Sequence, residues 1–368
     1  MPLAMNFDLL TNSKQHDRCE HLHDYGTNLD KTIPKSPLSN GTNRQTTSLL
    51  SSPPPPPPVK PRLRSTSNRV IRKIDLQQLN RCSQTCHFAL PHVENEKWLA
   101  IASSNEYMLV GGGSSSTLRL FDFQGKEIRQ INIKTFAAFD IAWSNSLKVF
   151  LIAGYDSLQM YNVEKDQLTS VEDINFSNKK DNYFWSIACH NNDLFVVLSD
   201  GLESIWRLSL PTFERKQTLS GSEIRESDVD DRISCIRTNG HLIGMTFRQR
   251  TTYQWRVDLF DYVTMTRTHR GLTIGCGNGS FNFIERCMLT PVDDHQWLII
   301  GGLEVKPNAL TLMDDRTGEI KQVLRSTNRQ EEFISNICTS ENSKRQLIIS
   351  MMIIDNKTDQ RQIHIFHQ

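Results

Sequence analysis

Residues that could bind a metal ion gather at three places in this sequence. They are Asp228, Asp230 and Asp231; His16, Cys19, His21 and His23; and Cys82, Cys86 and His87. The aspartates lack the spacing and the glycine of an EF-hand loop. A structural zinc site needs four ligands held by folded surroundings, which neither cysteine group offers. We therefore expect solvated side chains here and no metal.

Two glycine-rich segments invite a comparison with phosphate-binding loops. Gly111–Gly113 precedes three serines. It falls between an apolar run and an alternating run, where a hairpin loop is expected. Residues 275–280 read GCGNGS, but a strand follows them in our assignment, whereas a phosphate loop needs a helix. The motifs G-x-S-x-G, H-E-x-x-H and G-x-x-x-x-G-K-[ST] are absent. We expect no catalytic residue and no cofactor.

The proline run at residues 53–58 is the most distinctive local signal. Pro55, Pro58 and Lys60 fit the P-x-x-P-x-K pattern that SH3 domains read in a polyproline II helix. WW domains and profilin-like grooves also accept unbroken proline. The alternative is a spacer that keeps the segment extended.

Basic residues and serines surround the proline run. Arg62, Arg64 and Ser67 fit R-x-R-x-x-S, and Ser36 and Ser52 each precede a proline. These three serines are candidate phosphorylation sites, and phosphate would reverse the local charge. The basic stretch could also be a nuclear import signal, an anionic-lipid contact or a solvated linker.

Composition separates a tail from a folded body. Ten of the 14 prolines lie in residues 1–61, whereas all six tryptophans follow residue 97. A segment poor in large apolar groups cannot offset its ordering entropy, so we expect disorder over 1–69 and one domain over 70–368. A net charge of +1 gives no general attraction to nucleic acid. We find no membrane span and no signal peptide, so we expect an intracellular protein, cytoplasmic or nuclear.

The body repeats one triplet of short runs six times. The central run of each triplet is apolar on both faces, as a buried inner strand should be. These runs lie at 107–113, 148–154, 193–199, 241–247, 297–303 and 346–353. A mixed strand precedes each run and an alternating strand follows it, and we name the three a, b and c. Further runs at 127–133, 167–173, 214–220, 265–271 and 319–325 supply a fourth strand, d.

The c strands end in a large apolar residue followed by a polar one. The pairs are Phe121-Asp122, Tyr161-Asn162, Trp206-Arg207, Phe260-Asp261, Met313-Asp314 and Phe366-His367. They lie 40 to 54 residues apart, close to the ~40–50 of propeller blades. Residues 70–368 thus resemble the WD-repeat β-propeller family, whose blades end strand c in Trp-Asp. The resemblance implies an all-β propeller, and the six triplets predict that it has six blades.

The sixth triplet reaches residue 367 without a d strand after it. Residues 70–76, VIRKIDL, resemble the d strand at 127–133 and lie just before the first blade. Pairing the two chain ends would remove exposed sheet edges. We therefore expect residues 70–76 to close the ring and the polar stretch 77–97 to be a connecting loop.

Partners of the resembling family usually bind the face built from the b–c and d–a loops. Arg248, Arg250 and Tyr253 fall in one such loop, and arginine beside tyrosine suits a binding hot spot. We expect a non-enzymatic interaction scaffold whose tail recruits an SH3-, WW- or profilin-like protein. The alternatives are a propeller hydrolase or quinoprotein-like enzyme with a central-channel site, and a cullin-RING ligase substrate receptor. The ligase-receptor alternative rests on the partial match of Leu312–Arg316 to a W-D-x-R box.

Overall fold

The computed structural model describes part of the chain. The described residues are 86–90, 99–112, 117–133, 138–154, 157–171, 174, 183–198, 204–226, 230–249, 254–274, 287–300, 309–324, 332–342, 344, 346–355, 358 and 360–367. The chain divides into two units, residues 1–69 and 70–368, and every described residue belongs to the second.

Within the described residues, the strands form six antiparallel sheets of four strands, which we number as blades 1 to 6. Blade 1 contains β2 (Leu99–Ser103), β3 (Tyr107–Gly112), β4 (Thr117–Asp122) and β5 (Glu127–Asn132). Blade 2 contains β6 (Ala138–Ser144), β7 (Val149–Gly154), β8 (Leu158–Asn162) and β9 (Gln167–Ser170). Blade 3 contains β10 (Phe184–His190), β11 (Asp193–Leu198), β12 (Ile205–Ser209) and β13 (Arg215–Leu219). In these three blades the strand order follows the chain, as in a β-meander.

The last three blades repeat the pattern, except that blade 6 borrows a strand. Blade 4 contains β14 (Asp230–Thr238), β15 (Leu242–Gln249), β16 (Trp255–Asp261) and β17 (Arg267–Ile274). Blade 5 contains β18 (Leu289–Pro291), β19 (Gln296–Ile300), β20 (Leu310–Asp314) and β21 (Ile320–Leu324). Blade 6 contains β22 (Glu332–Glu341), β23 (Leu347–Asp355), β24 (Arg361–His367) and β1 (Cys86–Leu90). A short helix, α2 (Gly221–Ile224), lies between blades 3 and 4.

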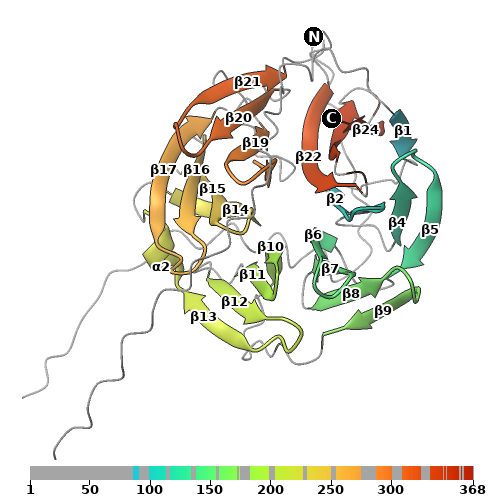
Figure 1. Ribbon diagram of the computed structural model, residues 1–368, viewed down its shortest axis with the longest axis horizontal. Helices are drawn as coiled ribbons and strands as arrows, with labels where there is room; N and C mark the ends of the chain where they lie inside the picture. Colours follow the sequence, from blue (N-terminus) through green and yellow to red (C-terminus); the bar gives the residue numbers. More distant parts are fainter. Residues whose placement is uncertain are drawn as a thin grey trace, which may run out of the picture. The chain divides into compact units, whose positions relative to one another are not determined.

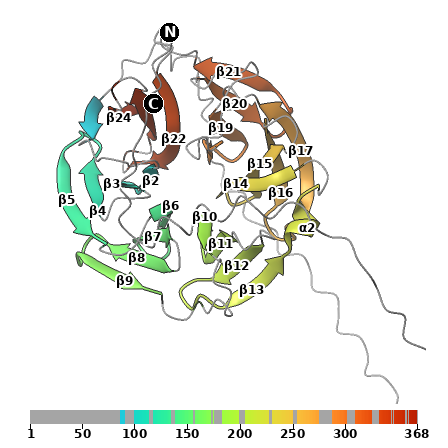
Figure 2. The same cartoon turned by 180° about the vertical axis from the view of Figure 1, so that it is seen from behind.

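The six blades form a closed ring (Figure 1). Each innermost strand contacts the innermost strand of the next blade, in the order β2, β6, β10, β14, β18, β22 and back to β2. Seen from the opposite side, the outer strands β5, β9, β13, β17 and β21 again lie at the circumference (Figure 2). The predicted six-bladed propeller is therefore confirmed.

The core lies between the blades. The second strands of blades 2 and 3, β7 and β11, are buried along their whole length. Such a strand can be apolar on both faces because a neighbouring blade covers each face. The resulting apolar clusters join blade to blade around the ring, so that each blade depends on its neighbours for burial.

The predicted closing strand is wrong. The strand that completes blade 6 is β1, which pairs antiparallel with β24 from Cys86 opposite Ile365 to Leu90 opposite Arg361. Residues 70–76 lie outside the described residues. Residues 86–90 can form this strand because their side chains alternate between the two faces. Cys86, Phe88 and Leu90 face inward, and the two residues between them, His87 and Ala89, are exposed. Because we judged residues 77–97 by their mean polarity, we missed this five-residue alternation.

The end of one c strand also differs from its prediction. Strand β12 continues past Trp206-Arg207 to Ser209, which pairs with the first residue of β11, Asp193. The same pairing occurs in blades 1, 4 and 5. There, the aspartate that ends strand c lies opposite the first residue of β3, β15 or β19, and these aspartates are Asp122, Asp261 and Asp314. The pair that ends this strand is therefore Leu208-Ser209, two residues beyond the predicted one.

Candidate functional site

One edge of the ring carries the a–b and c–d turns, and most of these turns are described. The polar residue that ends strand c forms the c–d turn with its own side chain. Oδ1 of Asp122 accepts hydrogen bonds from the backbone N–H groups of Gln124 and Lys126, both at 2.9 Å. Asp261 and Asp314 accept two such bonds each. The recurring polar residue of the sequence is thus a turn-forming group, which is why Asp and Asn dominate there.

The predicted site residues lie mostly outside the described residues. This applies to Arg250 and Tyr253 of the b–c loop, and to Pro55, Pro58, Lys60, Ser36, Ser52 and Ser67 of the tail. Arg248 is described, but it lies within β15 opposite Trp255 and is only 8% exposed. The prediction that it belongs to an exposed loop is therefore wrong, and its role in partner binding stays a prediction.

The junction between blades 3 and 4 is joined by a charged network. Oδ2 of Asp193 accepts hydrogen bonds from Arg207 at 2.7 Å and from the hydroxyl of Tyr262 at 2.8 Å. Its Oδ1 lies 2.7 Å from the ammonium of Lys216. Although burial opposes the charged form, the hydrogen bonds from Arg207, Lys216 and Tyr262 lower the pKa of Asp193 to about 2. The guanidinium of Arg207 also lies over the Tyr262 ring, 5.1 Å from its centroid.

Two further ion-pair groups are buried in the same part of the ring. The guanidinium of Arg237 in blade 4 contacts both oxygens of Asp140 in blade 2, at 2.8 and 2.9 Å, and Ser186 of blade 3 donates to the same carboxylate. Arg256 pairs with Asp230 and Asp258, and all three are at most 1% exposed. Although burial opposes it, the charge of Asp140 raises the pKa of Arg237 above its ordinary value. These charges are paired within the chain and are not presented to a ligand.

Two cysteines of the described residues, Cys189 and Cys338, are poor nucleophiles. Burial raises the pKa of Cys338 to about 11, and it raises the pKa of Cys189 to about 11 as well. The thiolate is the reactive form, so both side chains stay protonated at neutral pH. No three histidine, cysteine, aspartate or glutamate side chains of the described segments come together as a metal site.

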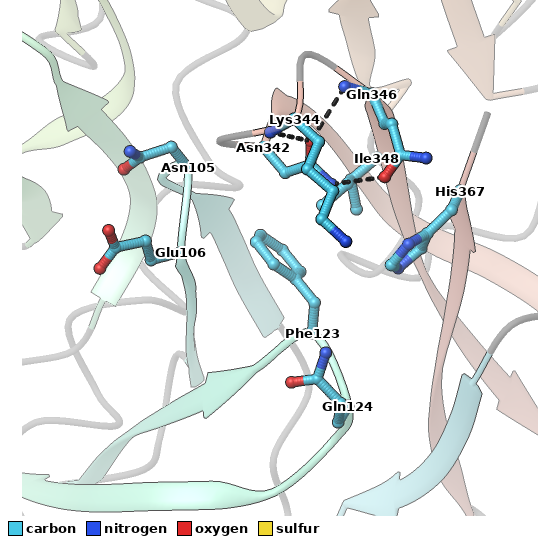
Figure 3. A pocket seen from close by; sticks show the side chains of 9 residues that line it. All are labelled: Asn105, Glu106, Phe123, Gln124, Asn342, Lys344, Gln346, Ile348 and His367. Carbon is cyan, nitrogen blue, oxygen red and sulfur yellow. Dashed lines mark hydrogen bonds between the residues drawn. The ribbon is translucent and has the colours of Figure 1, made fainter.

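An open pocket of about 420 Å³ lies at the junction between blades 6 and 1, on the edge with the a–b and c–d turns. Three turns and the end of β24 line it. The lining residues are Asn105, Glu106, Phe123, Gln124, Asn342, Lys344, Gln346, Ile348 and His367. Figure 3 shows the amine of Lys344 pointing into the space between Phe123 and His367. On the other side, the carboxylate of Glu106 points away from that space. The volume lies within the range of small-molecule pockets.

The closing strand sets one boundary of this pocket region. The thiol of Cys86 in β1 donates to the carbonyl oxygen of Gln124 at 3.1 Å. Phe88 packs on Phe121 with their ring centroids 4.8 Å apart. Because β1 thereby holds the c–d turn of blade 1 against blade 6, the pocket depends on the ring being closed.

Sequence reasoning missed every residue of this pocket and of the Asp193 network. Asp193 and Tyr262 are 69 residues apart and come from different blades, so no local spacing links them. One signal was available: Phe123 and Tyr262 each follow the polar residue that ends strand c. Aligning the blades at that residue would have placed both rings at the same point of a junction.

No protein-family model and no curated protein matches the sequence. Among solved structures, the chain is similar to the β-propeller domain of Cps50 (Swd1) from Myceliophteria thermophila, with a TM-score of 0.46 and 11% identity. That match covers 74% of this chain and 84% of the other. The assignment of six blades here follows from the strand pairing. No helix of the described residues has the length and apolarity to cross a membrane.

Proposed function

We propose that this chain is a non-catalytic interaction scaffold with the degenerate repeats of a WD-like propeller. This proposal is supported by a contrast between two sets of side chains: charged groups that are paired inside the propeller, and exposed groups that lie in its turns. Charged groups of low exposure around Asp193, Arg237 and Arg256 form ion pairs between or within blades. The side chains that face open space lie in turns held by their own hydrogen bonds, as at Asp122. A rigid frame with fixed exposed turns suits binding.

The tail adds a second binding element in this proposal. Residues 1–69 form the tail and residues 70–368 form the propeller, and Pro55, Pro58 and Lys60 recruit an SH3-, WW- or profilin-like domain. Phosphate on Ser36, Ser52 or Ser67 would place negative charge close to that segment and change its affinity. On the propeller, Arg250 and Tyr253 belong to the proposed b–c contact region, and Arg248 lies at the adjoining end of β15.

Affinity purification of the full-length chain from cells tests the scaffold role. Wild type is compared with Pro55→Ala/Pro58→Ala/Lys60→Ala, and Pro34→Ala is the control for a proline outside the motif. The proposal expects the triple variant to lose a subset of partners that wild type and Pro34→Ala retain. Identical partner sets would remove the tail from the proposal, and the absence of any specific partner would overturn the scaffold role.

The alternative functions give different results with the same protein. A central-channel enzyme would carry stoichiometric metal or cofactor after purification, which elemental analysis and absorbance would detect. A cullin-RING receptor would lose its adaptor on Arg316→Ala. The Arg316 guanidinium lies 3.3 Å from Asp314 in the c–d turn of blade 5, so this change leaves the core untouched.

A further inference from the structure

We infer that the pocket between blades 6 and 1 binds an acidic side chain of a partner peptide, with an apolar side chain next to it. This inference deepens the proposed scaffold role and rests on it. It starts from the shape of the pocket, whose floor is apolar: Ile348 is 1% exposed and Phe123 is 7% exposed. An apolar side chain of a partner would contact the small part of the Phe123 ring that stays exposed.

The charge of the pocket selects the second group of the partner. Lys344 is the lysine of the lining, and no described carboxylate forms an ion pair with it. Its amine points into the cavity, whereas Glu106 directs its carboxylate away from the cavity (Figure 3). A carboxylate that enters beside Phe123 would meet the ammonium group of Lys344 (Figure 3). Such an ion pair gains strength from partial exclusion of water.

The turn that presents Lys344 is organised before any partner binds. Oδ1 of Asn342 accepts hydrogen bonds from the backbone N–H groups of Lys344 at 3.0 Å and Gln346 at 2.9 Å. Nδ2 of Asn342 donates to Oε1 of Gln346 at 3.0 Å. On the facing wall, Asp122 and Cys86 hold the turn that carries Phe123 and Gln124. Because both walls are fixed, little ordering is needed on binding.

The other junctions provide an internal control for this reading. At the junction of blades 3 and 4, the position of Phe123 is occupied by Tyr262, whose hydroxyl is bound by Asp193. There, Arg207 and Lys216 neutralise the carboxylate from within the chain. At the junction of blades 6 and 1, Ile348 takes the position of Asp193 and Phe123 takes that of Tyr262, so no described carboxylate pairs with the nearby Lys344. A partner would supply a carboxylate to Lys344 from the open side of the pocket.

Fluorescence anisotropy with the full-length chain tests this inference. The probes are three labelled peptides of the same length, in which a phenylalanine is flanked by glutamates, by glutamines or by lysines. The acidic peptide should bind wild type about tenfold more tightly than the glutamine peptide. Lys344→Gln should abolish that preference, and Lys344→Glu should transfer it to the lysine peptide. Lys165→Gln is the control, because Lys165 is an exposed lysine in the c–d turn of blade 2.

The outcomes separate this inference from the scaffold role. Equal binding of the acidic and glutamine peptides, no binding of either, or an equal loss in Lys165→Gln would overturn the pocket assignment. Circular dichroism of each variant confirms that the fold is retained, and reversal of preference in Lys344→Glu cannot result from unfolding. Cellular partners recovered equally by wild type and Lys344→Glu would leave the scaffold role standing and remove the pocket from it.

Discussion

Two blade junctions of this ring use the same three positions in opposite ways. Between blades 3 and 4 the positions hold Asp193, Arg207 and Tyr262, joined by hydrogen bonds and an ion pair. Between blades 6 and 1 they hold Ile348, Ile365 and Phe123, which pack in one apolar cluster. The equivalence follows from register, because Asp193 pairs with Ser209 and Ile348 pairs with His367, the last residues of their c strands.

The comparison teaches that the propeller geometry does not require one kind of junction. At the polar junction, the triad is joined by Lys216, whose ammonium group lies 2.7 Å from the Asp193 carboxylate. At the apolar junction an open pocket remains, and Phe123 and Ile348 are among the residues that line it. A buried ion pair and an apolar contact of similar volume can give similar stability, so a sequence can exchange them when all partners change together.

The largest effect is expected from placing one member of the polar triad in the apolar junction. Ile348→Asp buries a carboxylate with no counter-ion, and we expect it to lower the free energy of unfolding by about 4 kcal/mol. Ile348→Asp/Ile365→Arg/Phe123→Tyr supplies the partners and should recover roughly half of that loss. Urea unfolding followed by tryptophan fluorescence measures both. A triple variant no more stable than the single one would show that the triad does not act as a unit.

The reverse exchange is expected to have the next largest effect. Asp193→Ala leaves Arg207 partly buried without its carboxylate, and the expected loss is about 3 kcal/mol. Asp193→Ile/Arg207→Ile/Tyr262→Phe removes the charges together and should lose only about 1 kcal/mol, because Lys216 is 44% exposed and can reach water. The same unfolding experiment distinguishes them. If the triple variant is the less stable one, the junction depends on its charges and not on its packing.

Acid should weaken the polar junction and not the apolar one. The pKa of Asp193 is lowered from 3.8 to about 2 in the folded chain. A lowered pKa stabilises the folded state above the unfolded value, and this contribution disappears as pH falls from about 4 to about 2. The difference in unfolding free energy between wild type and Asp193→Asn should therefore shrink by about 2 kcal/mol across that interval. A constant difference from pH 5 to pH 2 would contradict the assigned network.

The smallest effects are expected at two glycines that touch the neighbouring blade. Gly125 (φ +82°) lies against Phe88, and Gly240 (φ +90°) lies against the ring of His190. Alanine at either position would place its Cβ 2.6 Å or closer to a ring atom. Gly318 (φ +67°) has nothing within 4 Å and is the control for backbone strain alone. Gly318→Ala should cost about 1 kcal/mol, and the other two about 2 kcal/mol each. Equal thermal shifts for all three would deny the contacts.

The sequence was sufficient for the blades and insufficient for their junctions. Apolar runs such as 148–154 and the recurring pair at Phe121-Asp122 are local signals, and they located the strands within a few residues. The closing strand was missed because its alternation spans only Cys86–Leu90 and sits among polar residues. The Asp193 network and the Lys344 pocket were missed for a different reason. Their members converge from separate blades, so only the three-dimensional register shows which residues meet.

Ring closure by β1 is the claim on which the pocket and the blade 6–1 junction depend, and a cysteine cross-link tests it directly. Ala89 and Gln362 are opposite each other in the β1–β24 register, and neither side chain is buried. Such a pair lies within disulfide range. Under mild oxidation of the native chain, Ala89→Cys/Gln362→Cys should form a disulfide that peptide mapping detects, whereas Ile74→Cys/Gln362→Cys should not. A cross-link from residue 74 and none from residue 89 would contradict the account.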